Sequence, residues 1–124
     1  MSVTAIEEVV VDWPNDALGN ELRQYKTEGL DFSKEYEIGF SIDFDHWPLS
    51  NEKIESIKDK YDGCKFFDPT DEDIKFGYSN GYVIFTIKLK LSYTIISQIL
   101  KATTEETKRF GGCCKDWLIA LDHI

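Results

Sequence analysis

The stretch YEIGFSIDF, residues 36–44, alternates large apolar side chains with polar or small ones. Its apolar members fall at every second position: Tyr36, Ile38, Phe40, Ile42 and Phe44. In a β-strand this period of two places all five on one face and the other residues on the opposite face. Because such a strand covers a core on one side and meets water on the other, the stretch predicts an antiparallel sheet.

Three further stretches are typical of strands. YVIFTIKLKL, residues 82–91, alternates in the same way and carries lysines on its polar face. CKFFDP, residues 64–69, indicates a short strand that stops at its proline, which cannot donate a ladder hydrogen bond. CCKDWLIAL, residues 113–121, is expected to be the last strand.

Helical signals lie in three segments, within residues 15–29, 50–63 and 92–112. The first begins at Asn15 or Asp16 and the other two at serine, side chains that accept hydrogen bonds from unpaired N–H groups at a helix start. Apolar residues recur at helical spacing in each segment, and glycine ends each one.

After the first helix the predicted order is strand, helix, strand, strand, helix, strand. This order predicts an α+β protein with the ferredoxin-like βαββαβ arrangement, a four-stranded antiparallel sheet with two helices on one face. Residues 1–34 are expected to be an N-terminal extension with one helix, and residues 35–124 the ferredoxin-like domain, together one compact unit. Residues 6–13 fit a short strand or an extended arm, and residues 70–81, TDEDIKFGYSNG, a polar loop.

The charge of the 124-residue chain is unevenly distributed. The net charge is −9, yet residues 1–75 hold 19 acidic and 8 basic side chains, a net charge of −11. An acidic domain repels phosphates, which argues against direct nucleic-acid binding, and it attracts a basic protein partner. The alternative is that the acidity only keeps the protein soluble. With no apolar run long enough for a membrane span and no secretory signal, we expect a cytoplasmic protein.

The cysteines and histidines do not predict a catalytic, metal or cofactor site. Cys113 and Cys114 are adjacent, so in a strand they point to opposite faces, and neither they nor Cys64 has a partner at a zinc-ligand spacing. They are interpreted as small apolar side chains within strands. His46 and His123 are far apart in the sequence. We therefore expect no catalytic residues, no bound metal and no cofactor.

Tryptophan and acidic residues form the candidate partner-binding surface. Trp47 precedes a proline and lies two residues after Asp45, and a short acidic run comes after the second strand. Tryptophan is enriched where proteins bind one another, and carboxylates suit a basic partner. The predicted contact residues are Asp45, Trp47, Asp68, Asp71, Glu72 and Asp73.

The stretches DWPNDALGNELRQYKTEGLDFSKEYEIGFSIDFDHWP and GYVIFTIKLKLSYTII, with the ending FGGCCKDWLIAL, are similar to the ribonuclease E inhibitor RraB family. The resemblance runs from about Asp12 to Leu121. It implies a ferredoxin-like, acidic, cytoplasmic domain that binds ribonuclease E and lowers its activity without catalytic residues of its own. The partner it implies is a basic protein, a ribonuclease E-like enzyme with Arg-rich segments.

Two alternative functions remain open from the sequence, and the oligomeric state is open as well. One is an immunity-type antitoxin that neutralises a basic nuclease. Another is a small hydrolase that uses His46 with Asp43 or Asp45. The chain is expected to be a monomer or a homodimer. In a homodimer, two sheets could pack face to face. Tyr82 and Ile84, on the outer face of the third strand, favour this packing, whereas Glu37 and Asp43, on the outer face of the first strand, disfavour it.

Overall fold

Strand β1 (Glu35–Phe44) is one of two central strands in the computed structural model, which describes residues 13–120. Its apolar positions are almost fully buried: Ile38, Phe40 and Ile42 are inaccessible to solvent and Phe44 is 4% exposed. It pairs antiparallel with β3 (Tyr82–Lys90) on one side and with β4 (Gly112–Ile119) on the other. The strand on which the sequence places the core therefore lies in the middle of the sheet.

The short strand β2 (Lys65–Phe67) completes a four-stranded antiparallel sheet of order β2-β3-β1-β4. The predicted mixed α+β architecture with an antiparallel sheet is confirmed. β2 pairs only with residues 82–84 of β3. Among the described residues, the rest of that edge of β3 has no strand beside it.

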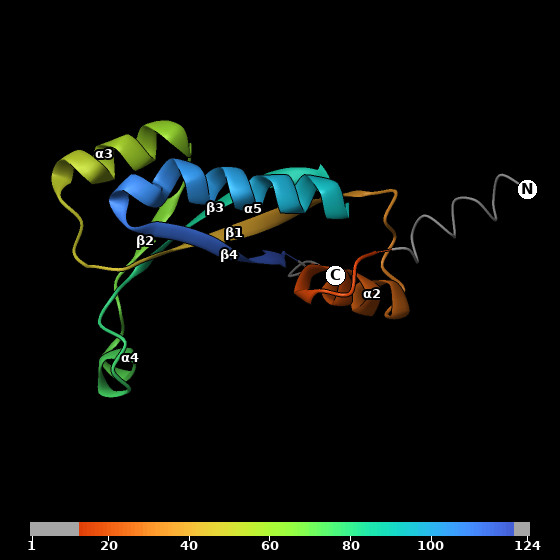
Figure 1. The fold of residues 1–124 in the computed structure, drawn as a ribbon, viewed down its shortest axis with the longest axis horizontal. Helices are drawn as coiled ribbons and strands as arrows, with labels where there is room; N and C mark the ends of the chain where they lie inside the picture. Colours follow the sequence, from red (N-terminus) through yellow and green to blue (C-terminus); the bar gives the residue numbers. More distant parts are fainter. Residues whose placement is uncertain (1–12, 121–124) are drawn as a thin grey trace, which may run out of the picture.

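Helices α3 (Asn51–Lys60) and α5 (Tyr93–Thr107) pack on one face of the sheet (Figure 1). Ser50 and Ser92 cap them, each accepting a hydrogen bond from the backbone N–H three residues on. The sequence predicts that the last helix reaches Phe110. In the structure, α5 ends at Thr107, and a 3₁₀ turn (Lys108–Phe110) leads to Gly111, whose φ of 77° suits glycine.

Helix α2 (Ala17–Thr27) lies beside the N-terminal end of α5 (Figure 1). Asp16 caps it, accepting a hydrogen bond from Gly19, and the Tyr93 hydroxyl of α5 donates to the same carboxylate. Leu22 of α2 is inaccessible to solvent and belongs to the common core. Residues 6–12 of the predicted arm or strand lie outside the described residues.

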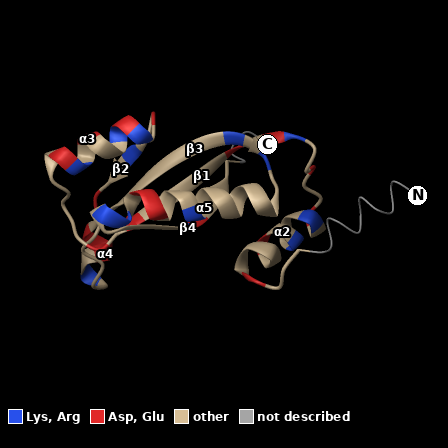
Figure 2. Cartoon of the chain, turned by 45° about the horizontal axis from the view of Figure 1, so that its top comes forward, with Lys and Arg blue, Asp and Glu red and all other residues tan. Residues whose placement is uncertain are grey.

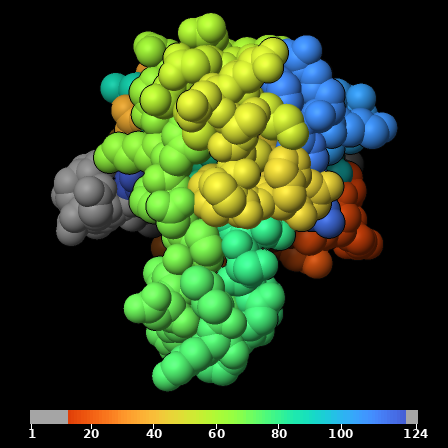
Figure 3. All heavy atoms as spheres, turned by 90° about the vertical axis from the view of Figure 1, so that its left-hand side faces the viewer, coloured from red at the N-terminus to blue at the C-terminus, as the bar shows by residue number. Residues whose placement is uncertain are grey.

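The segment between β2 and β3 is not the polar loop that the sequence predicts. It contains a short helix, α4 (Asp71–Lys75), and projects away from the body of the molecule (Figures 1 and 3). The helix forms because Thr70 and Asp73 cap each other: each side chain accepts a hydrogen bond from the backbone N–H of the other residue.

Charges of both signs occur on α3 and α5 (Figure 2), so neither helix presents a surface of one sign. Across residues 13–120, none of the helices is long and apolar enough to span a bilayer.

Candidate protein-docking surface

The segment of residues 68–81, here called the β2–β3 lobe, exposes three large apolar side chains. Ile74 is 55% exposed, Phe76 72% and Tyr78 68%. Figure 3 shows the lobe as a separate projection below the helices. Apolar side chains clustered on a projection have few neighbours of their own chain, so they are available to another molecule.

The same lobe is rich in acidic residues. Asp68, Asp71, Glu72 and Asp73 belong to the lobe, whereas Lys75 is its one basic residue. Asp71 and Glu72 are exposed. Asp73 is half-buried because its carboxylate caps α4, with Oδ2 2.9 Å from the Thr70 backbone nitrogen. The carboxylates of Asp71 and Glu72 are therefore accessible to a partner, whereas the carboxylate of Asp73 is engaged in capping α4.

Trp47, in the loop after β1, sits on the base of this lobe. Its indole Nε1 donates a hydrogen bond to Asp68 Oδ1 at 2.8 Å. The ring also lies against Gly81, where an added Cβ would come within 2.5 Å of Trp47 Cε2 and 2.2 Å of the Phe67 carbonyl oxygen. Only glycine permits that approach. Two loops that are distant in sequence therefore form one surface.

A small cavity opens beside Trp47. Its volume is about 280 Å³, its walls are mainly apolar, and its charged lining residues are Lys58 and Asp68. The lining residues are Trp47, Pro48, Leu49, Ile54, Lys58, Phe66 and Asp68. An aromatic face beside a carboxylate suits the flat guanidinium of arginine, which stacks on rings and bonds to carboxylates.

Asp45 has different neighbours. Its Oδ1 lies 2.6 Å from Nδ1 of His46, and its carboxylate borders Gly111, where an added Cβ would meet Oδ1 at 2.1 Å. Nε2 of His46 is 3.1 Å from Lys53 Nζ. The imidazole of His46 is 44% exposed and the carboxylate of Asp45 is 74% exposed. A hydrolase would need such a pair in an enclosed cleft, so this geometry does not favour the hydrolase alternative.

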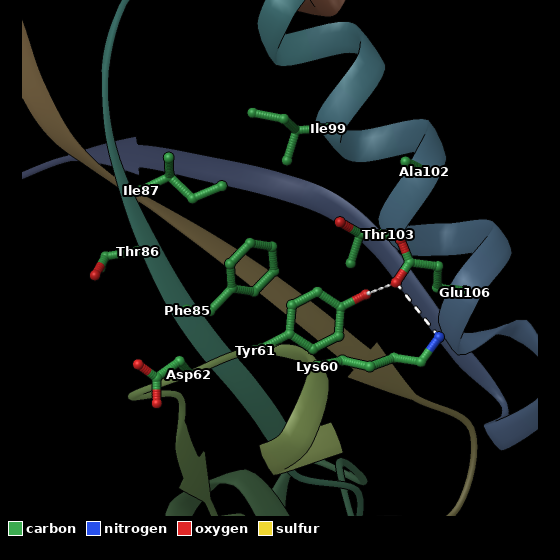
Figure 4. A pocket seen from close by; sticks show the side chains of 10 residues that line it. All are labelled: Lys60, Tyr61, Asp62, Phe85, Thr86, Ile87, Ile99, Ala102, Thr103 and Glu106. Atoms are coloured by element: carbon green, nitrogen blue, oxygen red, sulfur yellow. Dashed lines mark hydrogen bonds and ion pairs between the residues drawn. The ribbon is translucent and has the colours of Figure 1, made fainter. Parts of the chain in front are cut away.

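A second cavity, of about 420 Å³, lies between the end of α3, strand β3 and α5 (Figure 4). Phe85, Ile87 and Ile99 give it an apolar wall. At its rim, Glu106 accepts a hydrogen bond from the Tyr61 hydroxyl at 3.3 Å and pairs with Lys60 at 3.6 Å. These polar groups satisfy one another.

Cys113 and Cys114 lie in β4 on opposite faces, as the strand pattern predicts, whereas Cys64 directly precedes β2 and is not part of a strand. Cys114 is 3% exposed and belongs to the core, whereas Cys113 is half-buried on the opposite face of β4. Within residues 13–120, His, Cys, Asp and Glu side chains form no group of three that could hold a metal ion. His123 lies outside the described residues.

No protein-family model and no curated protein matches this chain. The resemblance to the ribonuclease E inhibitor RraB family therefore stays a prediction.

Of the predicted contact residues, Trp47 and Asp68 are in direct contact and Asp71, Glu72 and Asp73 share the lobe with Asp68. The apolar members of the lobe, Ile74, Phe76 and Tyr78, were missed. Their signal was present in the sequence as three large apolar residues at alternate positions within a polar segment.

Proposed function

We propose that this protein is a regulatory protein-binding module whose β2–β3 lobe and Trp47 cavity bind a basic segment of a partner protein. The observation that carries the proposal is the hydrogen bond between Trp47 and Asp68, which joins an aromatic cavity to an acidic, aromatic projection. Interfaces typically combine aromatic anchors at their centre with a polar, charged rim.

The chemistry of this surface selects the partner. Carboxylates on an exposed lobe lose little hydration until a partner arrives, and they attract Lys and Arg over several ångströms. Phe76 and Tyr78 add apolar area that charge alone does not supply. The best fit is an Arg-rich segment that also carries apolar residues, with one arginine seated in the Trp47 cavity and others along the lobe.

The partner proposed is a ribonuclease of the ribonuclease E type, bound through its Arg-rich segments in the cytoplasm. The resemblance described above supports this choice. The strand order β2-β3-β1-β4 bears on the fold alone. In a ferredoxin-like βαββαβ sheet the first and third strands are central, which supports the ferredoxin-like assignment. A bound lobe would lower ribonuclease activity by occluding the segment that it covers.

The test is a binding titration against a purified ribonuclease E that retains its Arg-rich scaffold region, paired with an RNA cleavage assay. The double variant Asp71→Lys with Glu72→Lys reverses two exposed carboxylates and leaves the Asp73 cap and the Trp47–Asp68 bond in place. We expect it to weaken binding about tenfold or more, to reduce the salt dependence of Kd and to relieve inhibition.

A matched control is Glu28→Lys with Glu105→Lys, which makes the same change in net charge at exposed sites outside the lobe. It should retain most of the affinity. Equal losses in the two double variants would mean that only the overall charge matters and would refute the lobe assignment. If the unmodified protein does not bind the ribonuclease at low salt, the proposed partner is wrong.

A further inference from the structure

The sheet face opposite α3 and α5, here called the open face, carries an apolar strip. Phe67 and Tyr82 stack there with ring centroids 5.0 Å apart. Ile84 and Leu118 flank Gly39, lying 3.7 and 3.8 Å from the position that a Cβ would take. Leu118 is 55% exposed and Phe67 36%. Apolar side chains on three strands therefore meet across the middle of this face.

Charges on the open face separate by sign across the sheet. The β2 and β3 side carries Lys65 and Lys88, and the β1 and β4 side carries Glu37, Asp43 and Asp116. All five are exposed. Glu35 of β1 and Lys90 of β3 follow the same division, whereas exposed Lys115, at the bulge of β4, is a basic residue beside Asp43. One half of the face is therefore basic, the other half is acidic apart from Lys115, and the apolar strip crosses the boundary.

We propose that the open face binds a second copy of this chain, forming a two-fold symmetric dimer with the two sheets packed face to face. The two-fold axis runs parallel to the strands, between β1 and β3. Rotation about this axis keeps each residue at its level along the strands and exchanges the two halves of the sheet. It thus places β3 of one copy over β1 of the other, and β2 over β4.

The strand register identifies which side chains of the two copies face each other. Lys88 is level with Glu37, so Lys88 of each copy faces Glu37 of the other. Lys65 is level with Ile84, and Ile84 with Ser41. Asp116 is also level with Ser41, so Lys65 of each copy faces Asp116 of the other.

The same register brings Tyr82 of each copy over Asp43 of the other, because these two residues are level. A phenol hydroxyl can donate to a carboxylate, so the acids of β1 do not oppose the packing. A second copy thus gives each of these five charged groups a partner on the other chain. By contrast, a two-fold axis in the interface plane and perpendicular to the strands would place β3 over β3 and β1 over β1, so that the basic halves face each other and the acidic halves do the same. Charge complementarity therefore selects the axis as well as the occupant.

Two single variants and their mixture test this arrangement. In a dimer of the Lys65→Glu variant, residue 65 of each copy would face Asp116 of the other, so two negative charges would meet. In a dimer of the Asp116→Lys variant, residue 116 of each copy would face Lys65 of the other, so two positive charges would meet. We expect the unmodified protein to sediment as a dimer and each variant alone to dissociate about tenfold or more readily. Mixed in equal amounts, the two variants should form a heterodimer, in which both facing pairs are again of opposite charge.

Restoration on mixing cannot come from within one chain. Lys65 and Asp116 lie on opposite edge strands, three strand spacings or about 14 Å apart, beyond a Debye length at ordinary salt. A control pair on α5, Lys101→Glu and Glu105→Lys, should leave the dimer unchanged alone or mixed. A monomer at all attainable concentrations would overturn the proposal, as would a dimer that ignores both substitutions or a mixture that stays dissociated. None of these outcomes bears on ribonuclease binding by the lobe.

Discussion

At the scale of single residues, the adjacent thiols Cys113 and Cys114 have different environments because consecutive strand residues point to opposite faces. Cys114 lies in the core at 3% exposure, and its burial raises the pKa of the thiol to about 12. Desolvation disfavours the thiolate, and the nearby carboxylates of Asp43 and Asp116 act in the same direction. The Cys114 thiol therefore stays protonated, and chemically inert, far into the alkaline range.

This shift makes stability depend on alkaline pH. The pKa of Cys114 is raised in the folded state from 9.0 to about 12, so the unfolded chain releases its proton first as the pH rises. The free energy of unfolding is therefore unaffected by this group below pH 9 and falls between pH 9 and 12, by at most about 1.4 kcal/mol per pH unit. Urea unfolding at successive pH values should show a shallower alkaline decline for Cys114→Ala.

Cys113→Ala provides the comparison, since it removes a thiol from the open face of the same strand. Tyr61, whose pKa is raised to about 12 mainly by burial, titrates in the same range in every variant and cancels from the comparison. Equal alkaline slopes for the two cysteine variants would show that the Cys114 thiol is not the group responsible.

At the scale of elements, the lobe depends on the reciprocal cap of a five-residue helix. A helix this short is marginal without such a cap, because nucleation is unfavourable. The lobe also has few apolar neighbours of its own, as the exposure of Phe76 and Tyr78 shows. Local capping thus decides whether the acids of α4 are presented in one arrangement.

Thr70→Ala should unfold the lobe without unfolding the protein. Loss of the cap costs about 1 kcal/mol locally, comparable to the whole stability of such a helix. We expect faster hydrogen exchange at the backbone N–H groups of Asp73 and Tyr78, with a midpoint of thermal unfolding close to that of the unmodified protein. Thr94→Ala, at an exposed site in α5, should leave that exchange unchanged. Slow exchange in Thr70→Ala would show that other contacts hold the lobe.

The regular elements were predictable from sequence because their signals are local. Alternation predicts β1 and β3, and the caps Asp16, Ser50 and Ser92 predict the helix starts. Helix α4 was missed because five residues are too few for a helical period, although Thr70 and Asp73 have the spacing of a capping pair. The contact of Trp47 with Asp68 was not predictable, since nothing local relates loops 21 residues apart.

At the scale of the whole molecule, α2 joins the rest through the core and through α5. Leu22 is fully buried in the common core, and the ring of Tyr25 lies 5.9 Å from that of Trp117 in β4. The predicted boundary at residue 34 therefore does not separate two cores.

Leu22→Ala should destabilise the entire protein. Truncating a fully buried leucine costs about 2–5 kcal/mol, and because α2 shares the core, unfolding should remain a single transition. Tryptophan fluorescence and far-ultraviolet circular dichroism should report the same reduced urea midpoint. Leu18→Ala, at a half-buried position of α2, should cost less. Two separate transitions, or an unchanged midpoint, would mean that α2 is an independent attachment.

The short length of β2 has a consequence for behaviour in concentrated solution. Beyond residue 84 the outer edge of β3 has no neighbouring strand among the described residues. The unpaired N–H and C=O groups of such an edge can form hydrogen bonds with a strand of another chain, which leads to aggregation. Lys88 and Lys90 stand on this stretch, and bringing their ammonium groups together on two edges is unfavourable. They act as gatekeepers against aggregation, and high salt, which screens charge, weakens that protection.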